Sequence, residues 1–177
     1  VAGRLFDEDD GVRKLAQEVF ARFRGIAGYD EQLVIIRRAA RIRGKVARRR
    51  TDALAALAAA RDVGSLDLCV ELIEDEDQAV GRAAHVALVA LTCEDLGPSM
   101  RKWGQWVDKN RGRSRIEWLI DALVSNDEAL RTSAGDEIKA LTQQYFGFHP
   151  SSPRREREVA QQKYRAWWQA EGKKQFG

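Results

Sequence analysis

The sequence predicts an all-helical protein, and three observations support the prediction. Apolar residues recur three or four positions apart rather than at every second position, as on the buried face of a helix. Only three prolines occur in 177 residues. Ala, Leu, Arg and Glu dominate, and all four favour helices. A single domain of this length buries roughly 70% of its unfolded surface, so it can form a core without disulfides or metal.

Four segments share one apolar pattern. In each segment, apolar residues stand at the first position, eight positions on and eleven positions on, which places them on one helical face. The four sets are Val12, Phe20 and Phe23; Val46, Leu54 and Leu57; Val80, Leu88 and Leu91; and Leu130, Ile138 and Leu141. The starts lie 34, 34 and 50 residues apart, so the last interval contains one period and a 16-residue insertion.

An acidic turn precedes most of these segments. Asp9, Asp77 and Asp127 stand three residues before a first apolar position, where a carboxylate accepts hydrogen bonds from the first turn of the following helix. The second copy has Arg43 there instead. Another apolar-periodic stretch precedes each of the last three turns, so the repeat is helix, short turn, helix. Because such a pair is apolar on more than one side, we expect neighbouring pairs to stack.

The turns IEDEDQAVGRAAHVALVAL and VSNDEALRTSAGDEIKAL resemble those of bacterial HEAT repeats, in particular the short HEAT-like repeats of phycobilisome lyases. The phrase LT....G before paired aromatic residues resembles the ends of such repeats. The resemblance covers nearly the whole chain and implies a right-handed solenoid of about four helix pairs in a single domain, residues 1–177. The implied segments are repeats at roughly 1–25, 30–61, 65–97 and 113–147, an inserted helix at roughly 99–109 and a C-terminal capping helix at 153–171. This scaffold serves interaction platforms, pigment lyases and DNA-reading enzymes alike, so it leaves function open.

Motifs typical of catalysis are absent from the sequence. There is no GxSxG, HExxH, phosphate-binding loop or dinucleotide fingerprint. The acidic runs at 7–10 and 74–77 lack the spacing of a calcium loop, and helix capping explains them. His85 falls on a helix flank and His149 in a loop, without an evident catalytic partner. We therefore predict no catalytic residues, no metal and no cofactor.

The cysteines and the hydropathy constrain the environment of the protein only loosely. Cys69 and Cys93 form no CxxC motif, and their spacing is compatible with two free thiols or with one bridge. No run of about 18 apolar residues occurs, so we expect no membrane span. The sequence begins at Val1, and we expect a fragment of a longer chain, which leaves the compartment open.

The most unusual composition lies at 37–50, RRAARIRGKVARRR, which contains no acidic residue. Its eight positive charges are those of Arg37, Arg38, Arg41, Arg43, Lys45, Arg48, Arg49 and Arg50. The whole chain has a net charge of +3, so the remainder has −5. One repeat is therefore basic, and its local field favours an anionic partner.

One interpretation of this arginine strip is structural. Arg49 and Arg50 stand where the other copies have mostly small or apolar residues that should face neighbouring helices. A charge at such a position must be paired or must reach water along its stem. Acids of adjacent repeats, such as Asp30, Glu31 or Asp52, are the expected partners.

The other interpretation is an anion-binding surface. In the arrangement that the HEAT resemblance implies, the second helices line the concave face. Arg48 and Arg49 would then lie in the groove, with Arg37, Arg38 and Arg41 on or near its outer wall. A phosphate backbone would require basic residues in several repeats, whereas these are concentrated in one.

Aromatic residues follow both LT....G phrases in pairs. Trp103 and Trp106 are three residues apart, as are Tyr164 and Trp167, so each pair lies on one helical face. We expect these pairs to cover the ends of helix pairs, and Trp118 to lie in the core.

The glycine of each phrase, Gly97 or Gly147, suits a left-handed residue at the end of a helix. The alternative for the aromatic residues is a stacking platform for nucleic-acid bases or a bilin, with Trp168 as its exposed member.

The leading hypothesis is a non-enzymatic protein–protein interaction scaffold that binds an acidic partner protein through a concave basic surface. Its predicted partner-binding residues are Arg37, Arg38, Arg41, Arg48, Arg49 and Trp168. The first alternative is a nucleic-acid-binding protein similar to HEAT-like DNA glycosylases, with Trp106 and Asp108 as candidates but no match to the motif of that family. The second alternative is a bilin lyase-like enzyme, which only the similarity of the repeats supports.

Overall fold

The computed structural model describes residues 2–43 and 47–177, so Lys45 and the repeat start at Val46 lie outside the described residues. Every regular element in the described part of the chain is a helix, which confirms the all-α prediction. The chain forms two compact units. Unit 1 comprises Val1–Leu91 and Asp95–Lys109, and unit 2 comprises Thr92–Glu94 and Asn110–Gly177. That residues 1–177 form a single repeat domain stays a prediction.

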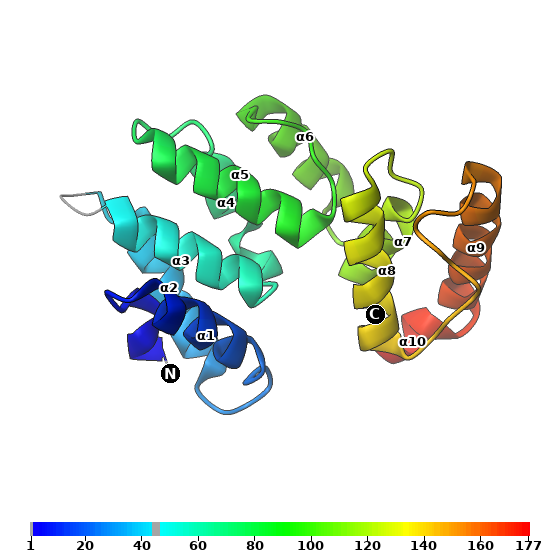
Figure 1. The fold of residues 1–177 in the computed structure, drawn as a ribbon, viewed down its shortest axis with the longest axis horizontal. Helices are drawn as coiled ribbons and strands as arrows, with labels where there is room; N and C mark the ends of the chain where they lie inside the picture. Colours follow the sequence, from blue (N-terminus) through cyan, green and yellow to red (C-terminus); the bar gives the residue numbers. More distant parts are fainter. Residues whose placement is uncertain (1, 44–46) are drawn as a thin grey trace. The chain divides into compact units, whose positions relative to one another are not determined.

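Unit 1 contains the helices that the sequence predicts as the second helix of each of the first three repeats. Its elements are η1 (Ala2–Phe6), α1 (Asp10–Ala21), α2 (Tyr29–Arg41), α3 (Ala47–Ala59), η2 (Val63–Ser65), α4 (Leu66–Leu72), nearly all of α5 (Gln78–Thr92) and α6 (Met100–Asn110). α2 packs on α3, and α3 also contacts α1 and η1. Figure 1 shows α1, α3 and α5 following one another in sequence order. α6 covers the segment where the sequence predicts an inserted helix.

The apolar pattern of the repeats identifies the centre of unit 1 well. Leu54, Leu57, Leu88 and Leu91 are all 0% exposed. Phe23, by contrast, is 42% exposed although it occupies the equivalent position of the first segment, because α1 has already ended at Ala21. The pattern therefore predicts the face of a helix, whereas burial also needs a neighbour on that face.

The acidic turns have the predicted capping geometry. Asp9 accepts a hydrogen bond from the N–H of Val12 at 3.0 Å, and Asp127 accepts one from the N–H of Ala129 at 2.7 Å. Asp77 does the same for Ala79 at 2.8 Å. Each carboxylate satisfies a backbone donor that has no partner within its helix, so the acidic residues are structural.

A second side chain supports each of these turns, two residues before the capping Asp. The side chains of Asp7, Asp75 and Ser125 accept hydrogen bonds from the backbone N–H of Asp9, Asp77 and Asp127, at 3.1, 3.0 and 3.2 Å. These local bonds hold the chain in a tight turn just before the helix starts.

An arginine in the following helix fastens two of the turns. Nη1 of Arg13 donates to the carbonyls of Asp7 and Glu8 at 2.8 and 2.9 Å. Nη1 of Arg131 donates to the carbonyls five and six residues before it, both at 2.9 Å. The turns before α1 and α8 therefore share this contact as well as the cap.

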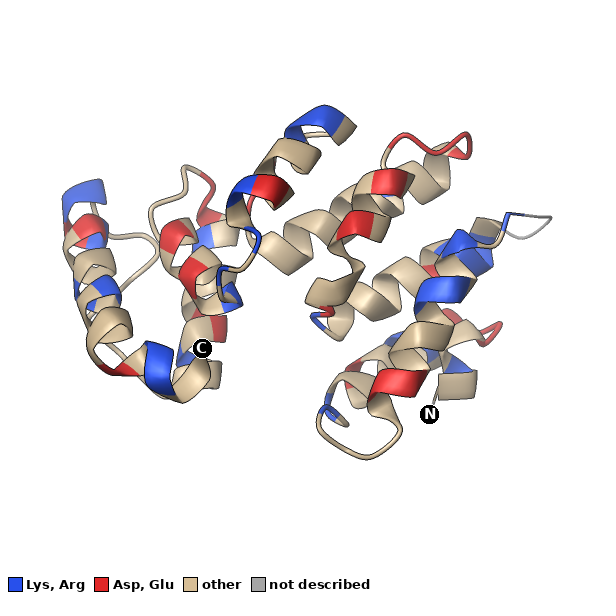
Figure 2. Cartoon of the chain, turned by 180° about the vertical axis from the view of Figure 1, so that it is seen from behind, with Lys and Arg blue, Asp and Glu red and all other residues tan. Residues whose placement is uncertain are grey.

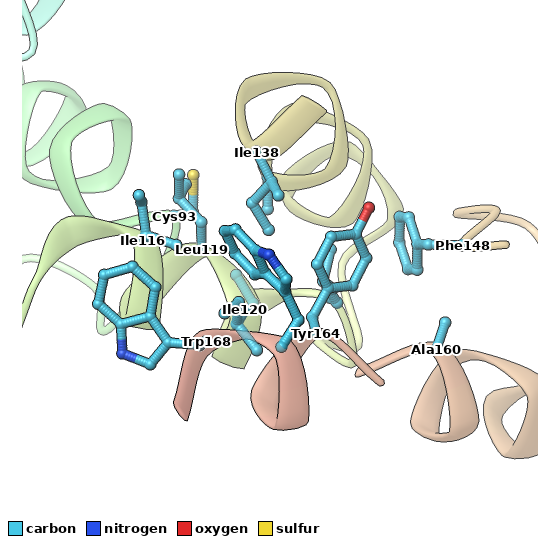
Figure 3. Packing of buried hydrophobic residues seen from close by; sticks show 13 residues of the cluster. Cys93, Ile116, Leu119, Ile120, Ile138, Phe148, Ala160, Tyr164 and Trp168 are labelled. Atoms are coloured by element: carbon cyan, nitrogen blue, oxygen red, sulfur yellow. The ribbon is translucent and has the colours of Figure 1, made fainter. Parts of the chain in front are cut away.

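Unit 2 contains α7 (Arg115–Ala122), α8 (Glu128–Thr142), α9 (Arg154–Trp167), the π-helical turn η3 (Trp168–Gly172) and α10 (Lys173–Phe176). α7 packs on α8 and α9. Tyr164 is 1% exposed and Trp167 8%, as predicted for aromatic residues that cover a helix pair. Figure 3 shows Tyr164 within the cluster that α7, α8 and α9 form.

The two LT....G loops end their helices in the same way, but not at the glycine. α5 ends at Thr92 and α8 at Thr142, and each threonine Oγ1 accepts a hydrogen bond from the N–H two residues on, at 3.2 Å. The left-handed residues that follow are Cys93 (φ 55°) and Gln143 (φ 57°). Gly97 and Gly147 are also left-handed but lie further along the loops. The prediction that these glycines stop the helices is therefore wrong, because the threonine side chain already ends each helix.

We predict opposite effects for two glycine-to-alanine substitutions in unit 1. Alanine favours a helix interior over glycine by about 1 kcal/mol, and no atom lies within 4 Å of a Cβ at Gly104, so Gly104→Ala should stabilise the protein by about 0.5–1 kcal/mol. A Cβ at Gly81 would lie 2.9 Å from the carbonyl oxygen of Ile73, so Gly81→Ala should destabilise it. Urea denaturation measures both. Equal stabilisation by the two variants would contradict the close packing at Gly81.

Candidate functional site

The arginine strip occupies the end of α2, the connection after it and the start of α3. Figure 2 shows this basic segment next to the acidic turn between α4 and α5. Because acidic residues of that turn lie close by, the surroundings of each guanidinium decide whether it is available to a partner.

Arg37 is used within the fold. Its Nε donates to Oδ2 of Asp62 at 2.7 Å and its Nη2 to Oδ1 at 2.5 Å, while the Asp62 side chain is only 4% exposed. Gly64 leaves room for the guanidinium, since a Cβ there would lie 2.6 Å from Nη2. This two-point contact raises the pKa of Arg37 and ties α2 to the connection after α3.

Arg50 is buried with its own carboxylate. Its Nε donates to the carbonyl of Ala40 at 2.9 Å, and its two terminal nitrogens donate to Asp75 at 3.0 and 2.6 Å. The side chains of Arg50 and Asp75 are 7% and 6% exposed. The hydrogen bonds from Arg50 are the main cause that lowers the pKa of Asp75. The structural interpretation of the strip therefore holds for Arg50.

Arg48 stands between the two interpretations. Its Nη2 donates to the carbonyls of Asp7 and Glu8 at 2.6 and 2.8 Å, the same acceptors that Arg13 uses. Its Nε lies 3.7 Å from Oδ2 of Asp52, and about half of the side chain is exposed. Arg48 thus fastens η1 and α1 to α3 and keeps one edge open to solvent.

Four arginines remain at the surface; we call Arg38, Arg41, Arg43 and Arg49 the exposed arginine set. Arg41 and Arg43 approach Glu71 and Glu76 only to 3.4 and 3.8 Å, with side chains 59% and 78% exposed. The Arg49 guanidinium lies 5.0 Å from the ring centroid of Phe6. Arg38 makes no ion pair with any residue that the structure describes. Exposed pairs of this kind stabilise a fold by about 1 kcal/mol or less, so these charges are available to a partner.

Trp168 is part of the core of unit 2 and does not form a surface platform. It is 2% exposed and packs in the cluster of Ile116, Ile120 and Ile138 (Figure 3). The prediction that Trp168 is exposed is therefore wrong. The π turn that begins at Trp168 explains the difference, because Gly172 leaves space for two consecutive indoles; a Cβ there would lie 2.8 Å from both Trp167 and Trp168.

The side chains best suited to chemistry, those of His85, Cys69 and Cys93, have surroundings typical of structural residues. Nε2 of His85 lies 2.8 Å from Oδ1 of Asp95, and the pKa of this carboxyl is lowered by the N–H of Gly97 and by His85. Cys69 and Cys93 are buried and not disulfide-bonded, and burial raises the pKa of the Cys69 thiol to about 12. Cys69 is therefore protonated near neutral pH and is a poor nucleophile.

No group of three or more potential metal ligands occurs among the described residues. The helices in the described ranges are all too short or too polar to cross a bilayer. Of the two candidate residues in the DNA glycosylase-like hypothesis, Asp108 is exposed and Trp106 is half-buried against Trp103.

Comparison with known proteins found no matching family model, no matching curated protein and no matching solved structure.

We predict that Asp75→Asn destabilises the protein far more than Glu71→Gln. Asparagine at 75 leaves the buried Arg50 charge without a carboxylate, which typically costs about 3 kcal/mol. Glu71 faces a solvent-exposed arginine, so its loss should cost about 1 kcal/mol or less. Urea denaturation at neutral pH compares the two variants. Similar losses would show that the Arg50 site tolerates an unpaired charge.

We also predict a pH signature of the same pair. Because the pKa of Asp75 is lowered in the folded protein, its ion pair stabilises the fold above the unfolded pKa and ceases to do so as pH falls through the folded pKa. The difference in unfolding free energy between wild type and Asp75→Asn should therefore shrink from about pH 5 to about pH 3. Denaturation at several pH values checks this. A constant difference would mean that folding does not lower the pKa of Asp75.

Proposed function

We propose that this chain is a non-enzymatic protein–protein interaction scaffold of HEAT-like repeats, which binds an acidic partner protein through a basic surface. The observation that supports the proposal most directly is the exposed arginine set. Its residues lie near the end of α2, in the connection after it and in the first turn of α3, and none of their guanidinium groups has a carboxylate closer than 3.4 Å among the described residues. Arginine is enriched in protein interfaces, where its planar donors pair with carboxylates.

The recurring turn geometry supports the HEAT-like part of the proposal. Three helices begin at an aspartate cap with a supporting side chain two residues earlier. Repetition of one local device along a chain is typical of helical-repeat arrays. In such an array α1, α3 and α5 would line the concave face, and Arg48 and Arg49 would be presented there.

The distribution of charge favours a protein over a nucleic acid as the partner. A phosphate backbone is best tracked by basic residues spread over successive repeats, whereas the exposed arginine set belongs to one. For bilin-lyase activity we have only the repeat-level resemblance.

We predict that charge reversal in the exposed arginine set strongly weakens binding to an acidic polypeptide. Arg38→Glu with Arg49→Glu should weaken binding to immobilised polyglutamate at least roughly tenfold at about 25 mM NaCl, and wild-type binding should fall strongly at about 300 mM. The matched control is Arg101→Glu with Lys102→Glu on α6, which makes the same change in net charge at two exposed positions.

An equal loss of binding in the control pair would mean that binding depends only on net charge. That result would contradict a defined basic surface. Tighter binding of duplex DNA than of polyglutamate at the same salt concentration would favour the nucleic-acid alternative instead.

A further inference from the structure

Three aliphatic side chains are exposed on α2 and at its C-terminal cap, beside the arginines. Val34 is 43% exposed, Ile35 52% and Ile42 66%. The opposite side of the helix, with Leu33 and Ile36, is buried. Grouped exposed apolar side chains are typical of a surface that another molecule covers.

The spacing of these residues defines two rows along α2. Ile35 and Ile42 are seven residues apart, two turns of one helical row. Val34 and Arg41 form a parallel row with the same separation, and Arg38 lies between the two rows. The exposed face therefore combines two aliphatic edges with a central guanidinium.

An apolar pocket lies at the other end of the same helix. It has a volume of about 290 Å³, and its lining includes Phe20, Phe23, Ile26, Tyr29 and Gln32. Tyr29 stacks on Phe20 with ring centroids 4.8 Å apart, and Ile26 is 60% exposed at the surface. A pocket of this size accommodates one large apolar side chain.

The pocket and the aliphatic residues follow one another along α2, and together we call them the apolar stripe. Gln32 lines the pocket and stands one turn before Ile35 on the same side of α2. At 1.5 Å per residue, the stripe from Gly28 to Ile42 is roughly 20 Å long, which equals about four helical turns. Arg24 helps to form the pocket in advance, because its guanidinium ties the α1–α2 connection to the carbonyl of Ala60.

Charge along α2 gives the surface a direction. Asp30 and Glu31 lie at the pocket end, whereas Arg38 and Arg41 lie at the other end, and all four are exposed. A partner that matches this order presents its carboxylates at the arginine end and its largest apolar side chain at the pocket end.

We propose that α2 binds an amphipathic helix of the acidic partner. One aromatic or large aliphatic side chain of that helix enters the pocket, further apolar residues cover Ile35 and Ile42, and its carboxylates pair with Arg38 and Arg41. A helix fits better than a strand because its apolar residues recur with the period of the stripe, and the described part of the chain offers no sheet edge to a strand. This inference rests on the proposed function and specifies the partner that the scaffold binds.

The test uses the full chain and a synthetic helical peptide of about 16 residues. The peptide has Phe near one end, Leu at three- and four-residue spacing and Glu over the other half, with a scrambled peptide of equal composition as its control. Binding is measured by fluorescence anisotropy. We expect Ile35→Ser and Phe23→Ser each to weaken binding roughly tenfold, since anchors in such grooves dominate affinity.

The matched control variant is Val86→Ser on α5, which removes an aliphatic residue at least as exposed as Ile35 elsewhere in unit 1 and should change binding less than about twofold. Arg38→Gln should weaken binding severalfold and reduce its salt dependence. Circular dichroism of each variant establishes that it is folded.

Three results would overturn the inference. The first is equal binding of the scrambled peptide, and the second is no effect of Ile35→Ser. The third is self-association of the chain that Ile35→Ser abolishes, because a second copy would then cover this face. The polyglutamate comparison of the two charge-reversed pairs decides the proposed function separately, so an acidic partner can be supported even when a helical one is not.

Discussion

A guanidinium that is removed from water needs a carboxylate and further hydrogen-bond acceptors. In unit 1, the buried Arg50 has both, and the contacts that it makes connect three elements of the fold. Arg50 extends from α3, donates to the carbonyl of Ala40 in α2 and binds both oxygens of Asp75 in the turn before α5. Oδ1 of Asp75 also accepts the N–H of Asp77, which caps α5. One side chain therefore fixes where a helix pair meets the turn that starts the next helix. Loss of either partner would leave a buried charge unpaired, so α2, α3 and the turn depend on each other.

This constraint divides an arginine-rich segment into two parts with different roles. Arg37 and Arg38 are neighbours in sequence, but Arg37 faces Asp62 whereas Arg38 faces solvent. Successive residues of a helix point in directions about 100° apart, so adjacent identical side chains can have unlike surroundings. A count of positive charge therefore overstates the basic surface, because some of that charge is neutralised inside the fold.

The sequence predicts the regular parts of the fold because they depend on local chemistry. The aspartate caps and the helical faces that contain Leu54 and Leu88 follow from residue type and spacing alone. The sequence also contains a pattern for the supporting side chains of Asp7, Asp75 and Ser125, because each stands two positions before a capping Asp.

The features that sequence reasoning missed depend on tertiary neighbours or on unusual backbone. Trp168 is buried because a π turn begins there and Gly172 leaves space, and neither condition is visible in helical spacing. The helix before Gly147 ends earlier because Thr142 binds the N–H of Gln144, a competition that the position of the glycine does not reveal. At the candidate site, spacing places Arg37 and Arg38 near one wall, but only the position of Asp62 separates their roles.

The paired arginines also bear on how the exposed ones could act. A surface binds more tightly when its groups are held in place beforehand, because less conformational entropy is lost on association. α2 is fixed near both ends of its buried side, by Arg24 through the α1–α2 connection and by Arg50 through Ala40, and Arg37 fixes its middle. The outward face of the same helix is thereby held as a rigid row of aliphatic side chains and guanidinium groups. Apolar contact along this row would supply affinity, and the arginines would supply orientation and a faster encounter with an acidic partner. The internal ion pairs therefore contribute indirectly to the proposed recognition, since they stabilise the helix that presents the exposed charges.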